Sequence, residues 1–170
     1  MKVRKKVLIL FFIALVLGIL AFLFTKEDIH IRLYIYNPIK QALESKDINI
    51  KVTRLEKYFV KEKIYKEAIN RLISYSDNNI YHLPIPKGTK VLNISVKNNI
   101  AYVDFSDELR KNHPGGSLGE MLTVYSIVDT LTEFPEIKKV QILISGAVVE
   151  TLVGHIDLTS PLDRDLSLVK

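Results

Sequence analysis

The chain has 170 residues, 48% of them hydrophobic, and contains neither cysteine nor tryptophan. The apolar content excludes a disordered chain, and the length suits one domain with an accessory segment. The lack of cysteine excludes disulfide frameworks, thiol chemistry, cysteine-based zinc sites and an acylated lipoprotein cysteine.

The net charge of +5 is unevenly spread along the chain. Four cations stand within the first six residues, at Lys2, Arg4, Lys5 and Lys6. Residues 26–100 hold 14 basic and 8 acidic side chains, whereas residues 101–170 hold 6 and 11. No basic patch is interleaved with aromatic residues, so nucleic-acid binding is rejected. The two halves suit either a solvated surface of mixed sign or a head-to-tail contact between copies of the chain.

Residues 7–24, VLILFFIALVLGILAFLF, form an uncharged apolar run. As a helix they would extend about 27 Å, close to the hydrocarbon thickness of a bilayer. The basic residues before the run favour a cytoplasmic amino terminus, which would place the rest of the chain outside the membrane. We therefore expect a cytoplasmic tail at 1–6, a single-pass transmembrane anchor at 7–24 and a short linker at 25–28.

A cleaved signal peptide is the alternative to this signal anchor. Signal peptides have an apolar region of about 7–15 residues that ends at small residues. Here the run is longer and ends in the bulky residues Phe22, Leu23 and Phe24. These features favour an uncleaved anchor; a mature amino terminus between residues 20 and 30 would establish cleavage instead.

The remaining sequence predicts one compact domain at 29–162, followed by a C-terminal tail at 163–170. Period-two alternation predicts strands at 29–36 and 48–53, and apolar spacings of three and four predict a helix at 59–75. A connector containing Asn78, Asn79 and two prolines leads to a hairpin. Its strands, 91–96 and 100–105, are joined by Lys97-Asn98-Asn99, in which Asn tolerates the positive φ of a tight turn.

A second helix is predicted at 117–131, with Ser117 as its N-cap and Glu120 completing a capping box. A strand at 139–144, a turn at 145–147 and a strand at 148–152 follow. This order predicts an α+β fold: an antiparallel-rich mixed sheet with two helices on one face.

Residues 115–119 read Gly-Gly-Ser-Leu-Gly, a literal G-x-S-x-G motif. Asp129 and His155 would be the partners of Ser117 in a serine hydrolase, but the motif does not follow a strand directly as a nucleophile elbow requires. A serine hydrolase is therefore rejected. The histidines lack the spacing of common metal motifs: His30, His82, His113 and His155. No catalytic, cofactor-binding or metal-binding residue is predicted, and no cofactor is expected.

Several ordered blocks carry a family resemblance: GSLGE at 116–120, YSIVDTLTEFPEIKKVQILI at 125–144, ETL at 150–152 and GHIDL at 154–158. Earlier blocks are LPIPKGTK at 83–90 and AYVDFS at 101–106. Together they resemble the GerMN domain of sporulation and spore-germination proteins of Gram-positive bacteria. Ser145-Gly146 stands where the family usually has Asp-Gly, and this chain has one copy of the domain and no lipid-modified cysteine.

The resemblance implies an extracytoplasmic module without known catalytic residues, with a fold similar to the ring-building motifs of membrane-associated rings. It implies an interaction or scaffolding role in sporulation or germination, with protein partners and self-association outside the membrane. Binding of cell-wall glycan is the alternative, through four tyrosines: Tyr34, Tyr36, Tyr81 and Tyr102. An enzyme is a third class, which no constellation of residues supports.

Overall fold

The computed structural model describes the chain except for residue 1 and residues 78–84. The predictions for Asn78, Asn79, Tyr81 and His82 therefore lie outside the described residues. The elements follow in the order α1 (Lys2–Leu23), β1 (Lys26–Asn37), β2 (Ala42–Thr53), α2 (Arg54–Phe59), α3 (Lys61–Asp77), β3 (Val91–Lys97), β4 (Ile100–Phe105), α4 (Glu108–Lys111), α5 (Ser117–Leu131), β5 (Lys139–Ile144), β6 (Leu162–Asp163) and the 3-10 turn η1 (Leu166–Leu168).

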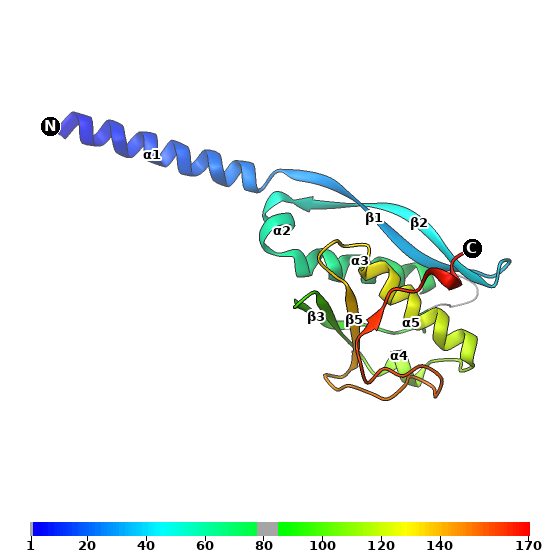
Figure 1. Ribbon diagram of the computed structural model, residues 1–170. Coiled ribbons are helices and arrows are strands. Elements are labelled where there is room, and N and C mark those ends of the chain that lie inside the picture. The colour runs from blue at the N-terminus through cyan, green and yellow to red at the C-terminus, as the bar shows by residue number, and fades with distance from the viewer. Residues whose placement is uncertain (1, 78–84) are drawn as a thin grey trace.

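Helix α1 projects away from the rest of the molecule (Figure 1). Its segment Arg4–Leu23 has a mean hydropathy of 2.9 and none of it is buried in the protein. The helix is long and apolar enough to cross a membrane, and a signal sequence would have the same character. Its apolar side chains surround the whole helix, a pattern typical of a membrane span or of a helix buried in a large core, and α1 is not buried in this domain.

Strands β1 and β2 form a two-stranded antiparallel ribbon, paired from Lys26↔Thr53 to Asn37↔Ala42. Both strands are longer than predicted. β1 begins at Lys26, so most of the predicted linker at 25–28 is strand. Residues 44–47 of β2 are polar and lack alternation, so their backbone pairing with β1 makes them part of the strand.

A separate four-stranded sheet has the order β3-β4-β5-β6. β4 and β5 are parallel, and the two other pairs are antiparallel. The predicted hairpin of β3 and β4 is confirmed, with Asn98 and Asn99 at φ values of 51° and 63°. Such values at both turn residues match the twist of an antiparallel hairpin.

Helices α3 and α5 lie between this sheet and the β1–β2 ribbon (Figure 1). Leu33 of β1, Leu72 of α3, Val128 of α5 and Phe105 of β4 belong to one buried cluster. The predicted α+β class with two helices on one face of the sheet is confirmed. The ribbon covers the other side of the helices, which is why α5 is buried on nearly all sides.

The helix predicted at 59–75 is found as α3, which begins two residues later, at Lys61; the short helix α2, which ends before a break at Val60, was not predicted. α2 begins directly after β2 with a capping box. The Glu56 amide donates to Thr53 Oγ1 at 3.2 Å, and the Thr53 amide donates to Glu56 Oε2 at 2.9 Å. These bonds pair amides that the first helical turn leaves without partners, so they start the helix at Arg54.

Two further predictions are corrected at the C-terminal end. Residues 148–152 form a loop rather than a strand. The predicted tail at 163–170 is part of the domain, because β6 includes Asp163 and the Lys170 amide donates to the Leu43 carbonyl at 3.0 Å.

Candidate functional site

A buried carboxylate on α5 organises the loop after β5. Glu120 is fully buried, and its Oε1 accepts the amides of Leu152 and Val153 at 2.8 and 3.1 Å. Its Oε2 accepts the His155 amide at 2.8 Å. The loop amides thus bind a side chain instead of a neighbouring strand, which explains why the apolar run at 148–152 is not a strand.

The predicted capping box of α5 is therefore wrong. Gly116, at a φ of 83°, is the N-cap, and no side chain makes a capping hydrogen bond there. Ser117 is the first helical residue and its side chain is exposed. Glu120 points to the domain interior rather than back to the helix start.

Ser117, Asp129 and His155 are not brought together as a catalytic triad. Ser117 and Asp129 are twelve residues apart on one helix, a separation of about 18 Å. His155 is exposed, and its backbone is bound to Glu120. The serine-hydrolase interpretation of these three residues is excluded by this geometry.

The different N-caps of α2 and α5 lead to a pair of predictions about stability. Thr53→Ala is expected to destabilise the domain by about 1 kcal/mol because it removes a capping bond. Ser117→Ala is expected to change stability by less than about 0.5 kcal/mol because its hydroxyl caps nothing. Thermal unfolding of the two variants measures this difference; equal losses would contradict the assignment of the caps.

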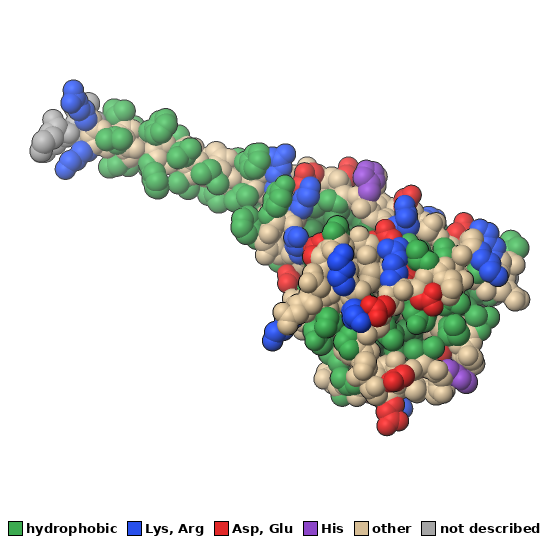
Figure 2. Space-filling model, in the orientation of Figure 1, with side chains coloured by type: hydrophobic (Ala, Val, Ile, Leu, Met, Phe, Trp, Pro, Cys, Tyr) green, Lys and Arg blue, Asp and Glu red, His purple; other side chains and the backbone are tan. Residues whose placement is uncertain are grey.

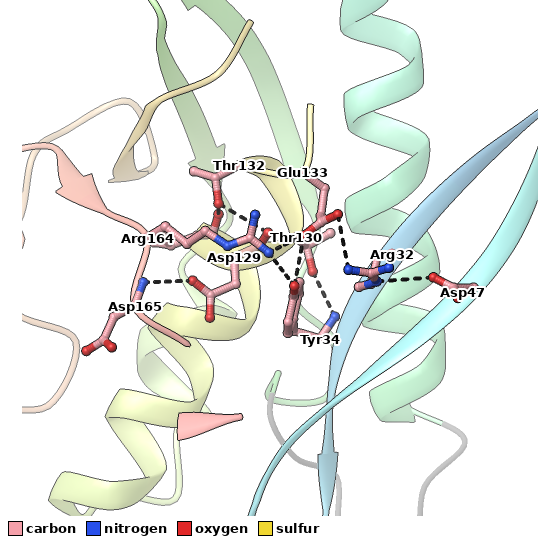
Figure 3. A network of polar contacts seen from close by, with 10 residues as sticks. Arg32, Tyr34, Asp47, Asp129, Thr130, Thr132, Glu133, Arg164 and Asp165 are labelled. Atoms are coloured by element: carbon pink, nitrogen blue, oxygen red, sulfur yellow. Dashed lines mark hydrogen bonds and ion pairs between the residues drawn. The ribbon is translucent and has the colours of Figure 1, made fainter. Parts of the chain in front are cut away.

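A polar network joins the C-terminal end of α5, strand β1 and the chain after β6 (Figure 3). The Tyr34 hydroxyl donates to Glu133 Oε1 at 2.8 Å, and the Tyr34 amide donates to Thr130 Oγ1 at 3.1 Å. Arg164 Nη2 contacts both the Tyr34 hydroxyl and Glu133 Oε1. Arg32 Nη1 lies 4.0 Å from Glu133 Oε2. The network binds three chain segments that are distant in sequence.

Asp129 is a buried and incompletely hydrogen-bonded member of this region. Its Oδ1 accepts the Asp165 amide at 3.1 Å, whereas its buried Oδ2 has no hydrogen-bond partner among the described residues. Burial raises the pKa of Asp129 to about 6, against the effects of the Asp165 amide and the nearby Arg164 charge. A carboxyl group with a pKa raised in this way becomes protonated at mildly acidic pH.

A groove of about 310 Å³ lies beside the network. Three segments line it: residues 29–32 of β1, the α2–α3 region and the chain at 133–136. Its floor includes Tyr65, whose ring packs edge-to-face on Phe134 at 4.8 Å between centroids. The lining mixes apolar and aromatic side chains with charges of both signs, including Arg32, Lys57 and Glu133. The aromatic residues and Arg32 belong to the residue types that are enriched at protein interfaces.

One wall of this groove is fixed by Glu136. Its Oε1 accepts the Tyr65 hydroxyl at 2.5 Å and the Lys61 ammonium group at 2.9 Å. Burial opposes ionisation of Glu136, but these two hydrogen bonds keep its pKa below the ordinary value. Burial, together with the Glu136 carboxylate, raises the pKa of Tyr65. The wall is therefore preorganised as an ionised, hydrogen-bonded unit.

Opposite charges from the two halves of the chain pair within the domain. Lys61 binds Glu136 at 2.9 Å, and Arg32 Nη1 lies 4.0 Å from Glu133 Oε2. The uneven distribution of charge along the sequence therefore does not produce one basic and one acidic side of the domain. It gives less support to head-to-tail contacts than the sequence suggested.

The acidic residues near the β3–β4 hairpin have structural contacts. Asp104 Oδ1 accepts the Gly146 amide at 2.7 Å, and Asp107 Oδ1 accepts the Ser145 hydroxyl at 3.0 Å. Ser145 and Gly146 have φ values of 49° and 82°. The two carboxylates thus hold the turn after β5 at Ser145-Gly146.

The histidines are dispersed within the described part of the chain. His113 is half-buried; its Nδ1 accepts the Gly115 amide at 3.0 Å, and its Nε2 lies 3.0 Å from Thr123 Oγ1. Burial lowers the pKa of His113, so the neutral ring is favoured. His30 and His155 are exposed. No group of three His, Asp or Glu side chains suited to a metal ion occurs among the described residues.

The described tyrosines of the glycan hypothesis do not form one platform. Tyr34 is buried in the polar network, and Tyr36 is half-buried on the same ribbon. Tyr102 is on β4, in the sheet on the other side of the helices. The sequence did not reveal the aromatic groove, because Tyr65 and Phe134 meet only through the packing of α3 on the end of α5.

The family of sporulation and spore germination proteins named Germane matches residues 32–150 of this chain. The chain belongs to the Germane family. The match begins within β1 and includes β2, both central helices and strands β3 to β5, whereas β6 and η1 follow it. A search of curated proteins finds no significant match.

Solved structures agree with this membership. A candidate lipoprotein from Clostridium perfringens is 28% identical, with a TM-score of 0.55 over 80% of this chain and 87% of that one. The first GerMN domain of the Bacillus subtilis sporulation protein GerM is 22% identical, with a TM-score of 0.52 over 80% of this chain and 98% of that one. The tandem GerMN domains of GerM match at 19% identity and a TM-score of 0.57, over 81% of this chain and 46% of that structure. The GerMN domain predicted from the sequence blocks is confirmed, and this Germane chain has the GerMN fold.

Proposed function

We propose that this Germane protein is a membrane-tethered interaction module that acts outside the cytoplasm in the assembly of an envelope protein complex during sporulation or germination. The observation that carries the proposal is the family match over residues 32–150. The apolar α1, with cations before it, supports a tether with a cytoplasmic amino terminus.

The connection between α1 and the domain supports a tether of this kind. β1 begins at Lys26, directly after the helix, so no long linker separates the domain from the membrane. Confinement to the membrane plane raises the effective concentration of neighbouring copies and partners, so that weak contacts suffice for assembly.

The groove at residues 29–32, the α2–α3 region and residues 133–136 is the proposed contact surface. It combines apolar side chains, aromatic rings and charges of both signs on a rigid framework. A preorganised surface loses little conformational entropy on binding.

Site-specific photo-cross-linking in sporulating cells tests this proposal. A photoreactive amino acid replaces His30, which lines the groove and is exposed, in the full-length protein. The matched control carries it at Lys97, an exposed residue at the end of β3. We expect several-fold more protein adducts from position 30 than from position 97.

Equal or absent adducts at the two positions would contradict the groove as a contact surface. Adducts to peptidoglycan alone, released by a muramidase, would instead support the cell-wall alternative. The tether is tested separately by the amino terminus of the native protein: a start between residues 20 and 30 would show cleavage and overturn it.

A further inference from the structure

Two large aromatic side chains are exposed at the end of α2. Tyr58 is 61% exposed and Phe59 is 71% exposed. Phe22 and Phe24, at the end of α1, are exposed as well. Aromatic side chains usually bury most of their surface, so a group of exposed ones indicates a surface that is covered by something else.

Helix α2 is attached to the end of α1 (Figure 1). The Arg54 amide donates to the Thr25 carbonyl at 3.1 Å. The Arg54 guanidinium group lies 4.0 Å from the centre of the Phe22 ring. Lys57, one turn later, binds Glu27 at 3.0 Å. These contacts hold the start of α2 at the level where the apolar helix ends.

The short length of α2 limits how far Phe59 can lie from the bilayer. The helix has six residues and is therefore about 9 Å long. The headgroup layer on each side of the hydrocarbon core is about 5–7 Å thick. Since Arg54 is bonded to Thr25, just after the apolar run, even the far end of α2 lies within about 9 Å of the hydrocarbon boundary.

The chemistry of this surface matches the headgroup layer. Tyrosine concentrates at the membrane–water boundary, exposed Phe side chains of interfacial helices insert there, and the long Arg and Lys side chains keep their charged ends at the headgroups. Figure 2 shows the hydrophobic side chains of α1 giving way to Lys and Arg side chains where the helix meets the domain. Arg54 and Lys57 are partly exposed at this boundary.

We propose that α2 and the exposed aromatic side chains Phe24, Tyr58 and Phe59 bind the phospholipid headgroup layer of the outer leaflet. The domain then rests on the bilayer instead of moving freely at the end of its tether. This inference rests on the proposed membrane tether. The groove shares Lys57 and Tyr58 with this surface, so it lies next to the bilayer, within reach of a neighbour in the same membrane.

The absence of tryptophan allows a direct test. The full-length protein is reconstituted into vesicles of phosphatidylcholine and phosphatidylglycerol, with or without lipid brominated near the top of the acyl chain. Phe59→Trp and, separately, Tyr58→Trp each introduce a single reporter at a site whose exposure leaves folding unaffected. Phe11→Trp lies about one turn inside the apolar run of α1, near the upper acyl chain of an inserted helix, and Leu92→Trp marks an exposed position on β3, in the layer beyond α3.

We expect brominated lipid to reduce emission from Trp at 58 or 59 by about twofold or more, because these positions lie at the interface, and to leave the reporter at 92 unchanged. Equal behaviour at 59, 58 and 92, with strong quenching at 11, would overturn the inference while leaving the tether intact. Lack of quenching at 11 would show that α1 is not inserted, and both proposals would then fail.

Discussion

Replacing Glu120 with alanine is expected to destabilise the domain by about 3–5 kcal/mol, because three buried backbone amides lose their acceptor at once. The loop that carries Leu152 and Leu158 into the core would lose its attachment to α5. Such a loss is a large fraction of the stability of an ordinary domain. Urea unfolding of the full-length protein in detergent, followed by the tyrosine near-ultraviolet circular dichroism, measures it.

Glu120→Gln is the matched control. Its amide oxygen can still accept the Leu152 and Val153 amides, whereas its amino group would face the His155 amide as a second donor. We expect a loss of about 2 kcal/mol, intermediate between wild type and alanine. If the alanine and glutamine variants were equally stable and close to wild type, Glu120 would not be the structural acceptor that its contacts indicate.

Asp129→Asn is expected to change how stability depends on pH. The pKa of Asp129 is about 6 in the folded protein and 3.8 in the unfolded reference. Between these two values the folded state holds a proton that the unfolded state has lost. The wild-type carboxyl therefore stabilises the fold at low pH, and this contribution disappears as pH rises through about 6.

The measurement compares the two proteins from pH 7 to pH 4. The stability of wild type relative to Asp129→Asn is expected to increase by about 2 kcal/mol over this range. His113, whose lowered pKa acts in the opposite direction below pH 6.5, is present in both proteins and cancels in the difference. Parallel stability curves would contradict a raised pKa for Asp129.

Local sequence patterns were sufficient to predict the elements that are stabilised by residues close to them along the chain. The apolar run of α1 and the turn at Asn98-Asn99 are found where they were predicted. A tight turn depends on the conformational freedom of its own residues, so its sequence is a direct signal.

The first half of β2 shows why other elements were missed. Its residues lack period-two alternation, and the hydrogen bonds that make them a strand come from β1. Propensity and pattern describe one segment at a time, whereas pairing depends on the partner strand.

Glu120 shows a related limit of prediction from local sequence patterns, in the candidate site. The spacing from Ser117 matched a capping box, but Glu120 also shares a helical face with Val124 and Leu131, which are buried. That second spacing was an available signal of a buried carboxylate. The backbone amide donors that it meets, 32 to 35 residues later in the chain, were not visible in any local pattern.

By itself, the sequence determined the apolar helix, the α+β class, the hairpin and the GerMN blocks, because each depends on the order of residues along the chain. Only the tertiary structure decided which polar groups are buried together: Glu120 with the loop amides, Glu133 with Arg164, and Tyr65 with Glu136. It also placed α2 beside the end of α1, since the β1–β2 ribbon folds back on itself. Burial and pairing are properties of segments in contact, and contacts between distant segments exist only after the chain has folded.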